Sequence, residues 1–149
     1  MARVVAQRVR SASVSVDGTV VASIGRGLAL LVGIREGDDE EAVTRLADKL
    51  AVLRVFEDQE GKMNLSAADV GGAMLVVSQF TLYADVRKGR RPSFVEAAEP
   101  GIGRRLYELF AARLAAHGYQ VACGRFGEHM VVDLENDGPV TIALDSREL

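Results

Sequence analysis

The chain has 149 residues, of which 48% are apolar and 26% charged, a composition typical of one folded domain with its own core. No apolar run approaches the ~20 residues of a membrane-spanning helix, and no signal peptide precedes the first strand pattern. The single cysteine, Cys123, excludes an internal disulfide, and we expect it to be a small core residue. We therefore expect a cytoplasmic protein with no membrane partner. The net charge of −3 provides no broad positive field, and we expect no DNA partner.

The first third of the chain predicts a hairpin, a strand and a helix. Residues 3–24 are rich in valine and contain the hairpin-turn dipeptide Asp17-Gly18. Residues 28–34 form an apolar strand. A helix then begins at Asp38 or Asp39, because Asp38 and Glu41 have the spacing of a capping-box variant. Apolar residues follow at helical spacing: Val43, Leu46, Ala47, Leu50 and Leu53.

The rest of the chain predicts further strands and a second helix. We expect strands at 53–56, 121–123, 130–134 and 140–144, and a buried central strand from Ala73. The second helix begins near Glu99-Pro100-Gly101, ends at Gly118, and has an apolar stripe of Ile102, Leu106, Leu109, Phe110 and Leu114. This order predicts a single α/β domain over residues 1–149, with layered, β-barrel-like sheets and helices packed on one face.

The central strand changes from apolar to polar side chains where it ends. After the apolar run, Ser78, Gln79 and Thr81 supply polar side chains, with Phe80 between them. Strand ends hold such groups rigidly at a surface, so this segment is a candidate pocket. The alternative is a strand end whose hydroxyl groups satisfy its own backbone.

The titratable residues exclude several kinds of chemistry. His117, His129 and Cys123 lack metal-ligand spacing, and no glycine-rich phosphate loop is present, so we expect neither metal nor cofactor. Thr81 is a nucleophile only if a base removes its proton, and no base is evident. The backbone amides of Phe80 and Thr81 can instead bind a developing oxyanion.

Two further features each allow two interpretations. Gly138-Pro139 is either a turn that only separates two strands or a turn with a functional role. A trans peptide bond before the proline is the default expectation. The second feature is a basic cluster that consists of Arg87, Lys88, Arg90 and Arg91. These side chains either contact phosphates or belong to a solvated loop with no ligand.

Two motifs together resemble the signature pair of the D-aminoacyl-tRNA deacylases, also called D-tyrosyl-tRNA(Tyr) deacylases. They are Ser78-Gln79-Phe80-Thr81-Leu82 and Asn136-Asp137-Gly138-Pro139-Val140-Thr141. The resemblance runs the whole length of the chain and includes residues 4–9, 61–65 and 91–94.

The resemblance implies the deacylase fold and a homodimer that hydrolyses the ester of D-aminoacyl-tRNA. It also implies activity on glycyl-tRNA, including glycine misattached to alanine tRNA. Gly138 and Pro139, joined by a cis bond, would enter the partner's active site as a chiral gate that excludes L side chains, with Arg8 holding the turn.

The resemblance also implies that Phe80 and Thr81 direct their amides at the scissile carbonyl, while Ser78 and Gln79 shape the pocket. Because no base is evident, we expect the 2′-hydroxyl of the tRNA's terminal ribose to activate water. Two alternatives are a general small-ester hydrolase with Thr81 or Ser78 as nucleophile, and a non-catalytic dimeric RNA-binding module.

Overall fold

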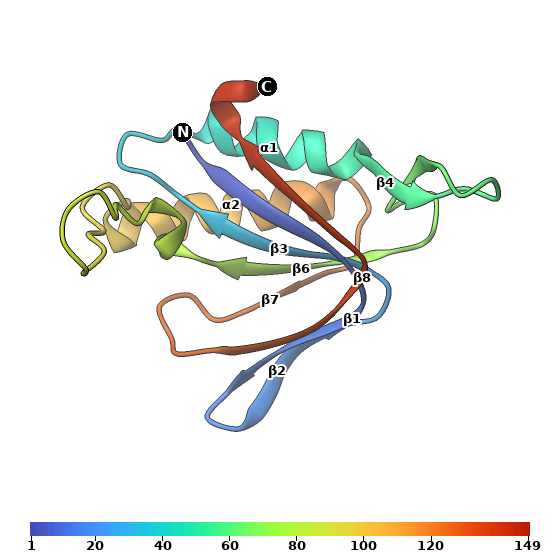
Figure 1. Ribbon diagram of the computed structural model, residues 1–149, viewed down its shortest axis with the longest axis horizontal. Helices are drawn as coiled ribbons and strands as arrows, with labels where there is room; N and C mark the ends of the chain where they lie inside the picture. Colours follow the sequence, from blue (N-terminus) through green and yellow to red (C-terminus); the bar gives the residue numbers. More distant parts are fainter.

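The computed structural model describes residues 1–149, which form a single α/β domain with a nearly closed, barrel-like sheet and two helices (Figure 1). The helices are α1 (Glu40–Val52) and α2 (Pro100–Ala116), and two 3-10 turns are η1 (Phe80–Tyr83) and η2 (Ser146–Glu148). The strands are β1 (Arg3–Val16), β2 (Thr19–Ile24), β3 (Gly27–Gly33), β4 (Arg54–Glu57), β5 (Met63–Ser66), β6 (Ala73–Ser78), β7 (Val121–Cys123) and β8 (Val131–Asp145).

The long strand β1 organises the main sheet, whose strand order is β2-β1-β3-β6-β7. Along one edge β1 pairs antiparallel first with β3 and then with β2, while β8 pairs with its other edge over nearly its whole length. β6 lies parallel to β3 and to β7. A separate two-stranded ribbon, β4-β5, projects from one end (Figure 1).

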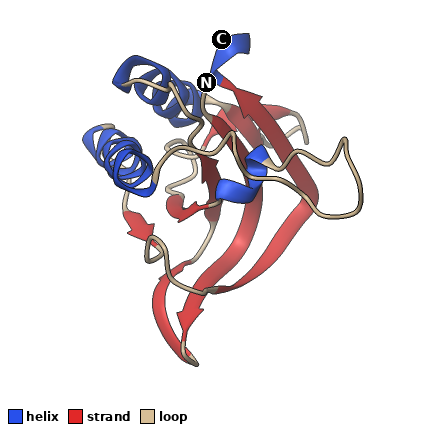
Figure 2. Ribbon diagram, turned by 90° about the vertical axis from the view of Figure 1, so that its left-hand side faces the viewer, coloured by secondary structure: helices blue, strands red, loops and turns tan.

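Both helices pack on the same face of the sheet, as the sequence predicts (Figure 2). Successive side chains of β6 point to opposite faces of the sheet, and each face has an apolar core. Met74 and Val76 lie under the helices, whereas Leu75 and Val77 belong to a smaller cluster on the opposite face. A strand buried on both faces reads as a continuous apolar run, which is the pattern of 73–77. Neither helix combines the length and the apolar character needed to cross a membrane.

The predicted hairpin is confirmed, with both Asp17 and Gly18 at positive φ in the turn between β1 and β2. The first helix is capped by Asp39, whose carboxylate accepts from the amide of Ala42 at 2.9 Å. The capping-box pairing of Asp38 with Glu41 is therefore wrong. Asp38 instead accepts from the backbone amide of Arg35 at 2.6 Å and pairs with the N-terminal ammonium.

Three other predictions need correction. Ile102 is 45% exposed and lies outside the apolar face of α2. Cys123, expected in the core, is exposed at the end of the edge strand β7. The two strands expected at 130–134 and 140–144 form the single strand β8. They merge because β1 continues past both segments, and residues 137–140 bulge out opposite Arg8 without ending the ladder.

Candidate active site

The polar end of β6 turns directly into a short helical turn. The amide of Gln79 continues the ladder by donating to the carbonyl of Val32 at 2.8 Å, and Leu82 donates to the carbonyl of Gln79 at 3.2 Å. Phe80 and Thr81 precede Leu82, so their amides have no partner inside this turn. The geometry leaves both amides available to an acceptor outside the turn.

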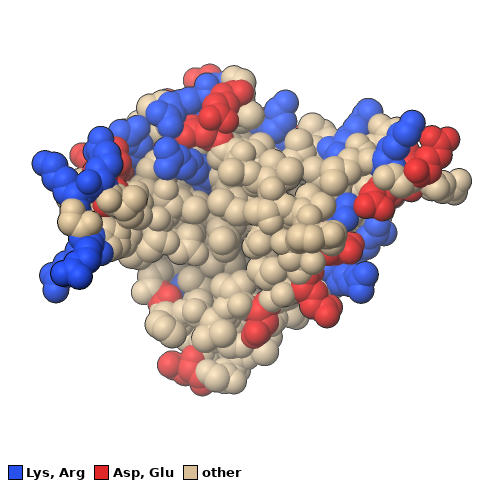
Figure 3. Space-filling view, viewed as in Figure 1, with Lys and Arg blue, Asp and Glu red and all other residues tan.

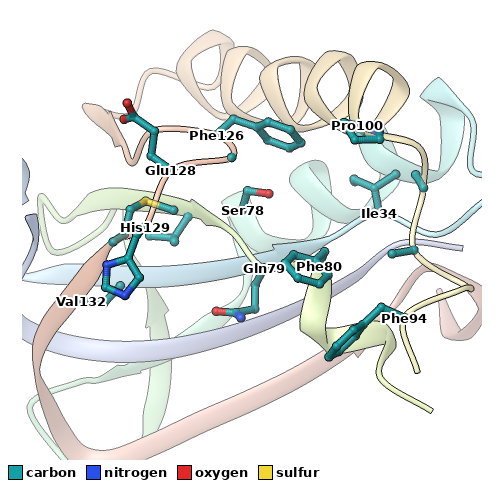
Figure 4. Close-up of a pocket in the computed structure, with 16 residues that line it drawn as sticks. Ile34, Ser78, Gln79, Phe80, Phe94, Pro100, Phe126, Glu128, His129 and Val132 are labelled. Carbon is teal, nitrogen blue, oxygen red and sulfur yellow. The ribbon is translucent and has the colours of Figure 1, made fainter. Parts of the chain in front are cut away.

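A cavity of about 740 Å³ lies beside this strand end. Figure 4 shows Ser78 and Gln79 on its floor between two walls, one containing Phe80, Phe94 and Pro100 and the other Glu128 and His129. Phe80 is 56% exposed, and its ring meets that of Phe94 edge to face with centroids 5.1 Å apart. An exposed aromatic at the mouth of a largely apolar cavity offers a flat surface for a ligand ring.

Thr81 lies outside this lining. Its hydroxyl oxygen accepts a hydrogen bond from the side-chain amide of Gln79, and no carboxylate or imidazole contacts it. Of the two hydroxyl groups expected at the pocket, only that of Ser78 belongs to a residue that lines the cavity.

Several lining residues were not singled out by the sequence pattern. The loop from β7 to β8 and the start of β8 supply Phe126, Glu128, His129, Met130 and Val132. They are about fifty positions from Ser78, and only the parallel pairing of β7 with β6 brings their loop to the cavity. Phe126 stands between Arg125 and Gly127, so no apolar run in the sequence signals its place in the cavity.

The Gly138-Pro139 turn lies at the bulge between β1 and β8, and its peptide bond is cis, as the resemblance implies. Arg8 holds this bulge from inside. Its guanidinium, with a side chain only 5% exposed, donates from Nε to the carbonyl of Asp137 at 3.0 Å and from Nη1 to the carbonyl of Val55 at 2.9 Å. Arg8 is thus a buried structural cation rather than a surface one.

Within one chain the turn and the cavity are far apart. The bulge lies opposite Arg8, which is level with Leu28 on β3 and Met74 on β6, whereas Ser78 lies at the other end of β6. Four residues along the strand and three strands across correspond to a separation on the order of 20 Å. The structure therefore brings Ser78, Gln79 and Phe80 together but leaves Gly138, Pro139 and Arg8 apart from them.

The basic cluster occupies the loop after η1, at the left-hand end of the molecule, where Figure 3 shows one of several groups of lysine and arginine side chains. Arg87 pairs with Asp85 at 2.7 Å, and these hydrogen bonds lower the pKa of Asp85 to about 2. Asp85 is therefore an ionised partner of Arg87. Lys88, Arg90 and Arg91 are exposed and have no ion-pair partner within the chain.

The fold and this geometry define a small α/β protein built around one concave, largely apolar site at the end of a buried strand. The model of the D-Tyr-tRNA(Tyr) deacylase family matches residues 5–145. A D-aminoacyl-tRNA deacylase of Thermomicrobium roseum is 64% identical over 147 residues, which cover 99% of this chain and 96% of that protein.

Two solved structures are similar over nearly their full length. The c-Myc DNA unwinding element binding protein has a TM-score of 0.90 and 39% identity, covering 96% of this chain and 97% of that one. A probable eukaryotic D-amino acid tRNA deacylase has a TM-score of 0.84 and 20% identity, covering 97% and 98%, which supports the fold. The chain belongs to the D-aminoacyl-tRNA deacylase family. It is therefore an enzyme of the hydrolase class.

Proposed function

We propose that this chain hydrolyses the ester bond of D-aminoacyl-tRNA and releases the free D-amino acid and tRNA. The cavity beside Ser78, Gln79 and Phe80 carries this proposal, because its volume of about 740 Å³ suits a terminal aminoacyl-adenosine. The exposed ring of Phe80 offers an apolar surface to the adenine. Membership of the deacylase family supports the same substrate class.

The ester carbonyl is activated by backbone groups in this proposal. The amides of Phe80 and Thr81, which have no partner inside η1, bind the oxyanion that forms when water attacks. Such donors are preorganised by the strand end and need no titratable side chain. Ser78 and Gln79 shape the floor on which the aminoacyl group lies.

The attacking water is activated by the 2′-hydroxyl of the substrate's own terminal ribose. Thr81 is unsuited to be the nucleophile, because its hydroxyl binds Gln79 and contacts no base. Glu128 and His129 are the titratable side chains of the cavity, and they lie on the wall opposite Phe80 and Phe94 (Figure 4). We assign neither of them the role of base.

The chiral gate is supplied by a second copy of the chain. Because Gly138-Pro139 lies on the order of 20 Å from Ser78 in one chain, the turn would reach a cavity only in a homodimer in which each copy enters the other. A backbone gate rejects every L side chain by steric exclusion without recognising any D side chain. Glycine has no side chain, so glycyl-tRNA, including glycine on alanine tRNA, would also be hydrolysed.

The basic cluster would contact the phosphates of the acceptor end. Lys88, Arg90 and Arg91 are exposed at the loop that also carries Phe94, so they lie near the mouth of the cavity. Contacts of this kind depend on salt and not on base sequence. We propose that residues 1–149 act as one deacylase domain, and that it works in the cytoplasm, where aminoacyl-tRNA is used.

The direct test is deacylation of D-tyrosyl-tRNA and L-tyrosyl-tRNA side by side. Rapid loss of the D ester alone supports the proposal, and glycyl-tRNA should be hydrolysed as well. Equal hydrolysis of both esters would favour a general esterase. Tight tRNA binding with no hydrolysis of any ester would favour the RNA-binding module.

The shared site has a separate test by complementation. A Phe80→Ala subunit has a damaged cavity, and a Gly138→Ala subunit has a damaged gate. Each variant alone should be impaired, whereas a mixed dimer contains one cavity and one gate that are both intact and should regain activity. Lack of recovery in a verified mixed dimer would contradict the cross-subunit gate.

A further inference from the structure

Arg8 links the gate to a second element, the β4-β5 ribbon. One side of its guanidinium holds the carbonyl of Asp137 beside the Gly138-Pro139 turn. The other side donates to the carbonyl of Val55 on β4, and its Nη2 lies 3.5 Å from Oε1 of Glu57 on the same strand. The ribbon and the gate are therefore held by one buried side chain.

Glu57 is the carboxylate dedicated to this guanidinium. Asp137 also lies near Arg8, at 3.8 Å from Nε, but Arg10 approaches the same carboxylate at 3.6 Å. Glu57 forms its ion pair with Arg8 alone. A guanidinium that is 5% exposed needs a carboxylate close by, because an uncompensated buried charge is strongly unfavourable.

The same nitrogen faces both Glu57 and the gate. A Cβ added to Gly138 would lie 2.9 Å from Nη2 of Arg8, so this nitrogen packs against the glycine. The position of Nη2 thus sets how much room Gly138 has. Glu57 Oε1 lies 3.5 Å from that nitrogen, and the bonds of Nε to Asp137 and of Nη1 to Val55 hold the rest of the guanidinium.

We propose that Glu57 is a positioning residue for the chiral gate, acting through Arg8 and touching no substrate. This inference rests on the proposed function of Gly138-Pro139. Loss of its charge would let the guanidinium turn toward Asp137 and shift the Gly138 backbone. The D ester would then be hydrolysed more slowly, and the exclusion of L esters would weaken.

The test compares Glu57→Gln with Glu60→Gln, a matched charge loss at the tip of the same ribbon, where Glu60 pairs only with the exposed Lys62. The ratio of D- to L-tyrosyl-tRNA hydrolysis should fall about tenfold in Glu57→Gln, in line with loss of a charged hydrogen bond, and stay unchanged in Glu60→Gln. Glu57→Asp should restore part of the ratio. An unchanged ratio in Glu57→Gln would overturn the inference.

Two readouts separate this role from a general effect on the ribbon. In an Arg8→Gln background, Glu57→Gln should cause no further change, because both variants remove one coupled unit; additive losses would overturn the inference. The NMR signal of the Arg8 Nε–H, measured without substrate, should shift in Glu57→Gln and not in Glu60→Gln, and an unmoved signal would equally contradict it. Wild-type protein that lacks D selectivity would instead contradict the proposed function.

Discussion

The side-chain amide of Gln79 donates a hydrogen bond to the hydroxyl oxygen of Thr81. This pairing holds the Thr81 side chain at the surface of η1, outside the lining of the cavity. The hydroxyl that looks most like a nucleophile in the sequence thus has an amide for a partner and no base.

Thr81→Ala should therefore keep its deacylation rate within about one order of magnitude of wild type, whereas loss of acid–base chemistry costs ~10²–10⁴-fold. The measurement is single-turnover hydrolysis of D-tyrosyl-tRNA, with circular dichroism to verify the fold. A folded variant with a thousandfold loss would support the Thr81 nucleophile.

The titratable residues of the cavity have a comparable test. If the ribose hydroxyl activates water, the double variant Glu128→Gln/His129→Gln should remain active to within about one order of magnitude, while a substrate ending in 2′-deoxyadenosine should lose ~10²-fold or more. Both rates come from the same single-turnover assay. Full activity on the deoxy substrate, combined with an inactive double variant, would assign the base to the protein.

Gly138→Ala should impair both stability and activity. Gly138 has φ +125°, and an added Cβ would lie 2.9 Å from Arg8 Nη2 and from Cγ2 of Val140. Backbone strain and the clash together should cost ~1–3 kcal/mol in the free energy of unfolding, measured with urea. Deacylation of the D ester should fall as well, because the gate must shift.

Gly71→Ala is the matched control, because Gly71 also has a positive φ, +68°, but open space around its Cβ position. It should lose ~1–2 kcal/mol of stability from the backbone alone and keep normal D-ester hydrolysis. Similar loss of activity in both variants would show that reduced stability, and not the gate, is responsible.

The basic cluster should act on tRNA affinity and not on the chemical step. Arg90→Gln/Arg91→Gln should raise KM, leave kcat near wild type and flatten the dependence of KM on salt, because fewer counterions are released on binding. Arg87→Gln should have a smaller effect, since Arg87 is already paired with Asp85. An unchanged salt dependence in the double variant would place the tRNA elsewhere.

Asp145 predicts how stability depends on pH. Hydrogen bonds from Arg147 and Arg3 hold the pKa of Asp145 far below its ordinary value of 3.8. A lowered pKa in the folded state means that the ionised carboxylate stabilises the fold above pH 3.8, and that this stabilisation is lost progressively as the pH falls below it.

Asp145→Asn should therefore be less stable than wild type by ~1–3 kcal/mol at pH 7, and the difference should shrink at strongly acid pH. Urea unfolding at several pH values measures both quantities. A difference that stays constant from pH 7 to acid conditions would show that the carboxylate charge is not the cause.

Most of the elements could be predicted from the sequence because their signals are local. The Asp17-Gly18 dipeptide predicts the first hairpin, the spacing of Leu46 and Leu50 predicts α1, and the run before Ser78 predicts a strand buried on both faces. The polar strand end and the Gly138-Pro139 turn are also visible, because each is a contiguous motif.

The residues whose surroundings come from distant parts of the chain could not be predicted in this way. Nothing near Arg8 in the sequence indicates that it is buried between Asp137 and Glu57, and Phe126 gives no sign that it lines the same cavity as Phe80. The two final strands merge because β1 runs past both of them.

The sequence by itself determined the two helices, most of the strands and the two candidate motifs, but not β5. Only the tertiary structure decided that the cavity lies at one end of β6, that the Gly138-Pro139 turn lies three strands away and level with the other end, and that Arg8 links this turn to Glu57. The physical reason is range: periodicity and turn chemistry act over a few residues, whereas strand pairing and the burial of a charge join residues far apart in the chain.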